Sequence, residues 1–113
     1  MSEGRFVVSE DPPEERTLAA VVSSAMTCGA FIVSLLDEVD GRSIHRDVLL
    51  AAWQTLRNLQ QAVLVWTYGL NGEPQAKLDE LAAGLGRPPS EVTGLQTGAM
   101  AHLRMIIWPS PLV

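Results

Sequence analysis

The chain has 113 residues and a formal net charge of −5, from 13 acidic and 8 basic side chains. This length suits one hydrophobic core and excludes several independent ones. With 47% apolar residues, the chain is too apolar to be disordered outside its termini. Ala, Leu, Gln and Glu dominate and strand signals are nearly absent, so the composition predicts an all-α globular domain.

The acidic excess lies in the first part of the chain. Residues 1–48 contain nine carboxylates and four arginines, whereas residues 49–113 contain four acidic and four basic side chains. A nucleic-acid-binding module normally carries a basic stripe, because contacts to phosphate supply most of its affinity. The neutral second half has no such stripe, which disfavours strong DNA or RNA binding.

Cys28 is the only cysteine, which excludes an internal disulfide and a CxxC site and is typical of a reducing compartment. We therefore expect a cytoplasmic protein. Residues 1–13 lack the basic-then-apolar order of a secretion signal and are expected to form a flexible arm. The segment from Gly4 to Val8 is expected to be loosely ordered, with a short strand or an apolar plug as alternatives.

A first long helix is predicted over about residues 14–40, between a proline-rich, acidic start and Gly41. Residues 17–36 carry no charge, and twenty helical residues span about 30 Å, the thickness of a bilayer core. No basic cluster or aromatic belt flanks them. A helix buried in a soluble bundle or dimer is therefore favoured over a membrane span. Weakly polar residues also interrupt the apolar surface, namely Ser23, Ser24, Thr27 and Ser34.

This first helix is also a candidate dimer seam. Small side chains let another helix approach closely, and a helix that is apolar nearly all round in so small a protein favours contact with a second molecule. The alternative is that it packs along the next helix of its own chain. The candidate seam residues are Ala19, Ser23, Ala30 and Ser34.

A second long helix is predicted from about Ile44 to Tyr68, with Ser43 as its N-cap and a possible break near Arg57-Asn58. Gly69 and Asn71-Gly72 then end it in a turn. The expected organisation is an arm (1–13), an N-terminal helical extension (14–48), a C-terminal domain (49–108) and a short tail (109–113).

The stretch from Tyr68 to Arg104 has the layout of a helix-turn-helix. Pro74 is predicted to open the third helix, whose apolar residues repeat at three- and four-residue spacing, and Gly84 and Gly86 are predicted to end it. The fourth helix starts after Pro89 and ends by Trp108. The whole chain is thus predicted to be a bundle of four to five helices.

Catalytic and metal-binding patterns are absent from the sequence. His45 and His102 are far apart without His or Cys at ligand spacing, and Cys28 lies in an apolar helix without an evident base. The acids Asp37, Glu38 and Asp40 lack the oxygen-rich loop of a Ca²⁺ site. We expect no cofactor, no metal and no enzymatic activity.

From Leu49 to Arg104, about half of the chain, the sequence resembles the C-terminal domain of primary bacterial sigma factors, which reads the minus-35 promoter element. Leu49 to Leu70 resembles the helix that ends in that family's Arg-Phe-Gly-Leu or Arg-Tyr-Gly-Leu, and Asn71 to Pro74 resembles its glycine-proline loop. Leu78 to Leu81 matches its Leu-Asp-Glu-Ile, and Ala99 to Arg104 its Thr-Met-Ser-Lys-Leu-Arg ending. The resemblance implies a sigma-like helix-turn-helix fold.

The departures from this family fall on its DNA-reading residues. Where the family carries a run like Arg-Glu-Arg-x-Arg-Gln, this chain has Pro89, Ser90, Glu91, Thr93 and Gly94. Each lost bidentate base contact is worth about 1–3 kcal/mol. The remaining possible DNA contacts are Arg87, Ser90, Thr93, Thr97 and Arg104.

The sequence therefore favours a transcription-associated regulator that uses a degenerate sigma-like fold mainly for protein contact, with RNA polymerase or a sigma-binding regulator as partner. A dimeric DNA-binding regulator is the alternative, and an oligomerisation or scaffold unit is the third hypothesis. The resemblance implies a partner-binding surface at Leu56, Leu59, Val63 and Trp66, although these residues at helical spacing are equally typical of a core.

Overall fold

A computed structural model describes Phe6, Val8 and residues 14–36 and 44–108. These parts of the chain contain helices and no strand, which confirms the all-α prediction. The described residues form six α-helices rather than four to five, because both predicted long helices are broken. In chain order the elements are α1 (Glu15–Thr27), α2 (Gly29–Leu36), α3 (Arg46–Gln54), α4 (Asn58–Tyr68), the 3-10 turn η1 (Leu70–Gly72), α5 (Leu78–Leu85) and α6 (Pro89–Ile107).

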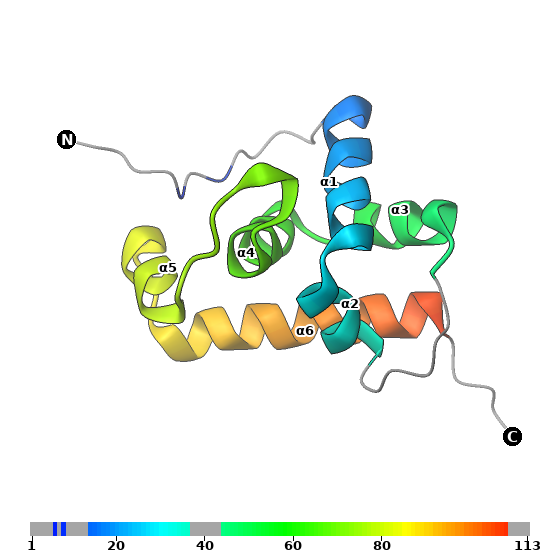
Figure 1. Ribbon diagram of the computed structural model, residues 1–113. Coiled ribbons are helices and arrows are strands. Elements are labelled where there is room, and N and C mark those ends of the chain that lie inside the picture. The colour runs from blue at the N-terminus through cyan, green and yellow to red at the C-terminus, as the bar shows by residue number, and fades with distance from the viewer. Residues whose placement is uncertain (1–5, 7, 9–13, 37–43, 109–113) are drawn as a thin grey trace, which may run out of the picture.

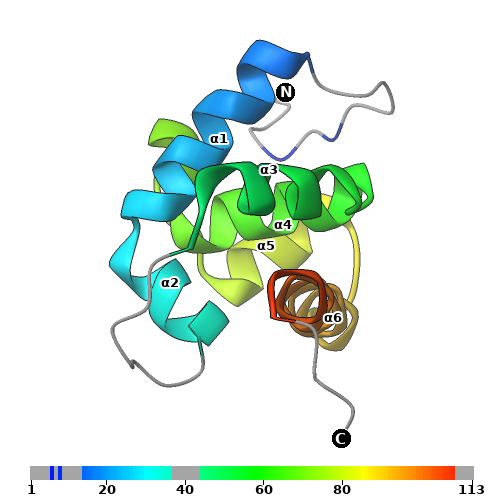
Figure 2. The ribbon, with the colours of Figure 1, turned by 90° about the vertical axis from the view of Figure 1, so that its right-hand side faces the viewer.

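Helix α6 is the longest element and the others pack around it. It contacts α2, α3, α4 and α5, and Figure 1 shows it running along one side of the molecule from α5 at one end to α3 at the other. Figure 2 looks nearly along its axis, with α2 beside it and α1 at the opposite corner of the molecule.

The prediction of one helix over residues 14–40 is wrong. The chain breaks at Cys28, whose backbone is extended (φ −83°, ψ 109°), and α1 and α2 meet at an angle of 79°. The hydroxyl of Thr27 donates to the carbonyl of Ser24 at 3.0 Å, a local bond that competes with the helix. Gly29, a poor helix former, follows the break. Residues 37–43, which include Asp37, Glu38, Asp40, Gly41 and Ser43, lie outside the described residues.

This bend bears on the membrane alternative. Within the described ranges, no single helix is long and apolar enough to cross a membrane, and α1 with α2 meets that test only as a bent pair.

The second predicted helix breaks between Gln54 and Asn58, at the expected place. The hydroxyl of Thr55 donates to the carbonyl of Ala52 at 2.6 Å. The buried amide of Gln61 donates to the carbonyl of Trp53 at 2.7 Å. These side chains add to the backbone amides of Thr55 and Leu56, which donate to the same two carbonyls at 3.1 Å, so the last carbonyls of α3 have partners.

The larger of two apolar clusters joins α1, α2, α3 and the second half of α6. Phe31, which has no exposed surface, makes edge-to-face contacts with Trp53 and Tyr68, at centroid distances of 6.3 and 5.3 Å. The other buried members come from the same helices, from Leu64 of α4, from Leu70 of η1 and from Ile44 and Leu56, which flank α3, and they include Val22, Leu35, Leu49, Met100 and Leu103.

The smaller cluster joins α4, α5 and the start of α6. Its buried members are Val63, Trp66, Ala76, Leu81, Ala82 and Val92.

Two chain segments outside these helices also contact the smaller cluster. Phe6 and Val8 pack against it. For these two residues the structure agrees with the alternative prediction of an apolar plug. The amide of Ala76 donates to the carbonyl of Trp66 at 2.8 Å and holds the connection before α5 in extended form. Helix α5 therefore begins at Leu78, so the prediction that Pro74 opens it is wrong.

Gly69 and Gly86 end α4 and α5 as predicted. Both adopt the left-handed conformation, with φ of 68° and 69°, which side chains disfavour. Their surroundings differ. A Cβ on Gly69 would lie 2.9 Å from the carbonyl oxygen of Glu73, whereas a Cβ on Gly86 would have no atom within 4 Å.

These two glycines provide a matched stability test. Gly86→Ala should lower the free energy of unfolding by about 1 kcal/mol, the cost of a left-handed alanine. Gly69→Ala should cost about 2–3 kcal/mol, because the same backbone penalty is joined by a clash with backbone atoms. Urea unfolding followed by circular dichroism measures both. Equal losses would show that the turn after α4 relaxes freely.

Candidate functional site

Helices α5 and α6 and the three residues between them, Gly86 to Pro88, form the part of the chain predicted to be a helix-turn-helix. The amide of Arg87 donates to the carbonyl of Ala82 at 3.0 Å and closes the end of α5. Pro88 is the N-cap of α6 and Pro89 opens it, as proline favours. The helix bounds therefore match the prediction on both sides of the turn.

Part of the exposed surface of α6 is made of small, uncharged residues. The apolar side of the helix, from Val92 to Leu103, packs in the two clusters. Gly94 faces open space, because a Cβ placed there would have no atom within 4 Å. We call six of the exposed residues the outer face of α6, namely Ser90, Thr93, Gly94, Thr97, Gly98 and Ala101; Pro89, Glu91, His102 and Met105 are exposed as well.

Charge near this face is neutralised locally. The guanidinium of Arg87 forms an ion pair with the carboxylate of Glu91 one turn later. Both side chains are about two-fifths exposed, at 40% and 44%, so the pair can open in solvent. Of the predicted DNA contacts, Arg87, Ser90, Thr93 and Thr97 thus lie on or beside the outer face, with no net positive charge between them.

Arg104, the fifth predicted DNA contact, points elsewhere. Its Nε donates to the carbonyl of Leu35 at 2.9 Å, and its Nη2 donates to the carbonyl of Ser34. These carbonyls lie in the last described turn of α2, near the negative end of its helix dipole. The guanidinium of Arg104 thus binds the end of α2 in a partly buried position, and its role as a DNA contact stays a prediction.

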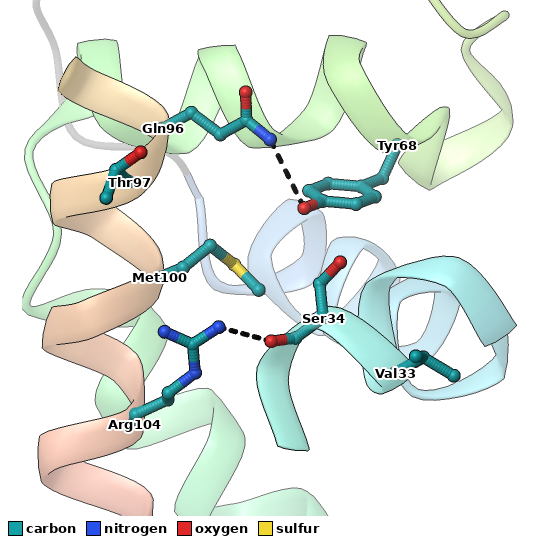
Figure 3. Close-up of a pocket in the computed structure, with 7 residues that line it drawn as sticks. All are labelled: Val33, Ser34, Tyr68, Gln96, Thr97, Met100 and Arg104. Atoms are coloured by element: carbon teal, nitrogen blue, oxygen red, sulfur yellow. Dashed lines mark hydrogen bonds between the residues drawn. The ribbon is translucent and has the colours of Figure 1, made fainter. Parts of the chain in front are cut away.

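Beside this contact, α2, the end of α4 and α6 enclose a groove of about 400 Å³ (Figure 3). The amide of Gln96 donates to the hydroxyl of Tyr68 at 3.3 Å across it. No sequence pattern predicted the groove, because its residues come from three helices far apart in the chain. It is lined by Val33, Ser34, Tyr68, Gln96, Thr97, Met100 and Arg104.

The proposed partner-binding surface on α4 is also corrected. Leu56, Val63 and Trp66 are buried, at 5%, 0% and 6% exposure, and only Leu59 is partly exposed. Leu56, Val63 and Trp66 are therefore core residues, which is the alternative interpretation of their helical spacing. The large apolar side chains that are exposed instead are Val33, Val48, Leu78 and Met105.

The four candidate seam residues do not share one straight helix face. Ala19 and Ser23 belong to α1, Ala30 and Ser34 belong to α2, and the bend of 79° separates the two pairs. Ser23 and Ala30 are exposed, whereas Ala19 and Ser34 are half-buried. The four residues therefore form no single continuous face in this structure, and the dimer seam stays a prediction.

The histidines and the cysteine have structural partners. His45 is the N-cap of α3, and its Nδ1 accepts from the amide of Asp47 at 3.2 Å. His102 Nε2 lies 2.7 Å from the hydroxyl of Thr55, and Cys28 Sγ donates to the carbonyl of Tyr68 at 3.6 Å. Over the residues that the structure describes, no three His, Cys, Asp or Glu side chains come together as metal ligands.

No protein-family model, curated protein or solved structure matches the chain. The sigma-factor resemblance therefore stays a prediction that rests on short motifs within residues 49–104.

Replacing Arg104 in α6 should lower stability much more than replacing Arg87 in the turn before α6. Arg104→Ala should lower the free energy of unfolding by about 1–2 kcal/mol, because two carbonyls of α2 lose a charged donor in a partly exposed site. Arg87→Ala should change it by less than about 0.5 kcal/mol, as expected for an exposed pair. Thermal unfolding of the two variants measures the difference, and a loss at Arg87 as large as at Arg104 would contradict this assignment.

Proposed function

We propose that this chain is a transcription-associated regulator whose α5–α6 unit contacts a protein partner, RNA polymerase or a factor that binds sigma domains, and does not read DNA. The observation that carries the proposal is the Arg87–Glu91 ion pair beside the small, uncharged residues of the outer face of α6. The motifs that resemble the sigma domain supply the link to transcription. Their residues occupy α3, α4, the connection to α5, α5 and α6, in that order.

Electrostatics argues against DNA as the main ligand. A protein gains affinity for DNA by releasing counterions from phosphates, and each contact requires a cation. On this surface Arg87 already has a carboxylate partner, and Arg104 is held by the carbonyls of α2. Binding DNA would require breaking the first pair and leaving Glu91 facing phosphates, which is repulsive.

The same surface suits a protein partner. The cores of protein interfaces are depleted of charge, and the glycines of the outer face let another backbone approach closely. Leu78, at the start of α5, adds an exposed apolar side chain, at 40% exposure. A flat contact made by small residues and a few apolar ones is therefore available without any rearrangement of the core.

Capture of polymerase subunits from a bacterial lysate tests the proposed partner. The wild-type chain should retain RNA polymerase subunits, and Gly94→Gln should reduce retention at least tenfold by adding bulk to the outer face. Glutamine is a better helix former than glycine, so this variant should fold well. Ala51→Gln, which changes an exposed residue of α3, is the matched control and should retain the partner.

Recovery of no polymerase subunit and no sigma-binding factor by the wild-type chain would overturn the proposal. The scaffold hypothesis would then be favoured.

Fluorescence polarisation with random duplex DNA tests the electrostatic argument. The wild-type chain should not bind at low salt, whereas Glu91→Arg combined with Thr93→Arg should. These changes free Arg87 and add two cations, so binding should weaken with salt with a slope of about 2 to 3 on logarithmic axes. Glu15→Arg with Ala20→Arg makes the same charge change on exposed positions of α1 and should bind much less.

Binding of the wild-type chain to DNA at low salt, with a steep salt dependence, would favour the dimeric DNA-binding alternative and contradict the protein-contact function.

A further inference from the structure

An aromatic contact joins the N-terminal segment to the smaller cluster. The ring of Phe6 meets Trp66 edge-to-face, with a centroid distance of 5.0 Å and an interplanar angle of 80°. Val8 packs against the same cluster. Phe6 and Val8 together therefore make a two-residue apolar contact with the smaller cluster.

Gly84 makes room for this contact. It lies inside α5, where glycine is the least favourable residue apart from proline. A Cβ at this position would lie 2.1 Å from Cδ2 of Phe6, and the three nearest atoms to it all belong to the Phe6 ring. The ring of Phe6 therefore occupies the space that a side chain at position 84 would fill.

The walls of this site have packing partners and a hydrogen bond besides their contacts with Phe6. Trp66 is held by its cluster with Val63 and Leu81, and by the bond between its carbonyl and the amide of Ala76. Partly buried apolar residues adjoin the same cluster and extend the apolar surface beyond the ring. They are Leu59, Ala62, Val65, Leu85 and Leu95.

We propose that Trp66 and Gly84 are the centre of a binding site for a short extended segment with an aromatic residue followed two positions later by a β-branched residue. Phe6 and Val8 fill the site from within the chain, and a partner protein that carries the same pattern displaces them. An intramolecular occupant acts at an effective concentration of about millimolar. It therefore keeps the apolar surface covered until a stronger segment competes. This inference is independent of the transcription-related proposal.

A double-mutant cycle tests the contact between Gly84 and Phe6. In a Phe6→Ala chain, Gly84→Ala should raise the melting temperature by about 4–6 °C, because helix propensity improves and the site is empty. In the wild-type chain this gain should be absent or reversed, because the new Cβ expels the ring. The indole N–H signal of Trp66 in NMR spectra should move to the same place in Gly84→Ala and Phe6→Ala. Equal temperature gains in both backgrounds would overturn the proposal.

Peptide binding tests whether the site accepts a segment supplied from outside. The full chain with Phe6→Ala and Val8→Ala should bind a synthetic peptide of residues 3–10 at least tenfold more tightly than the wild-type chain does. Binding should return the Trp66 indole signal to its wild-type position. A peptide with alanine in place of its phenylalanine should not bind, nor should the normal peptide bind after Gly84→Leu is added to the double variant.

Absence of peptide binding to a folded Phe6→Ala, Val8→Ala chain would show that these residues are fixed parts of the core. Binding that survives Gly84→Leu would place the site elsewhere. Either result would overturn the proposal.

Discussion

The burial of Phe31 is the constraint on which the rest of the structure depends. Its ring contacts Trp53 of α3 and Tyr68 of α4 and has no exposed surface. Burying an aromatic side chain of about 150–250 Å² contributes about 4–6 kcal/mol, whereas a backbone hydrogen bond lost at a helix break costs about 1 kcal/mol. The balance favours a bend at Cys28 over a straight helix that would leave half of its apolar surface in water.

This bend determines what several polar residues do. It creates a C-terminal end of α2 against α6, and the guanidinium of Arg104 is the donor that satisfies its carbonyls. At the break between α3 and α4, the amide of the buried Gln61 is a second donor to the carbonyl of Trp53, which also accepts from the amide of Leu56. Arg104, a candidate DNA contact in the sequence, thus caps α2 in the structure. One positive charge fewer is therefore available for binding DNA.

Local signals predicted the second half of the fold well. Gly69, Gly86 and Pro89 act through their own backbone preferences, so the ends of α4 and α5 and the start of α6 could be read from sequence. The break at Cys28, the inward turn of Arg104 and the groove beside it depend on contacts between residues far apart in the chain. Periodicity identifies an apolar face, but it does not show which partner that face will meet.

The candidate partner-binding residues on and just before α4 also show how little periodicity says about the packing of an apolar face. Helical spacing is identical for a core face and a docking face, and only the packing of α5 and α6 over Val63 and Trp66 separates the two. The inner face of α6 packs in both clusters, so the two surfaces that we propose for binding other molecules are its outer face and the site occupied by Phe6. Helix α5 contributes to both, through Leu78 in the first case and Gly84 in the second.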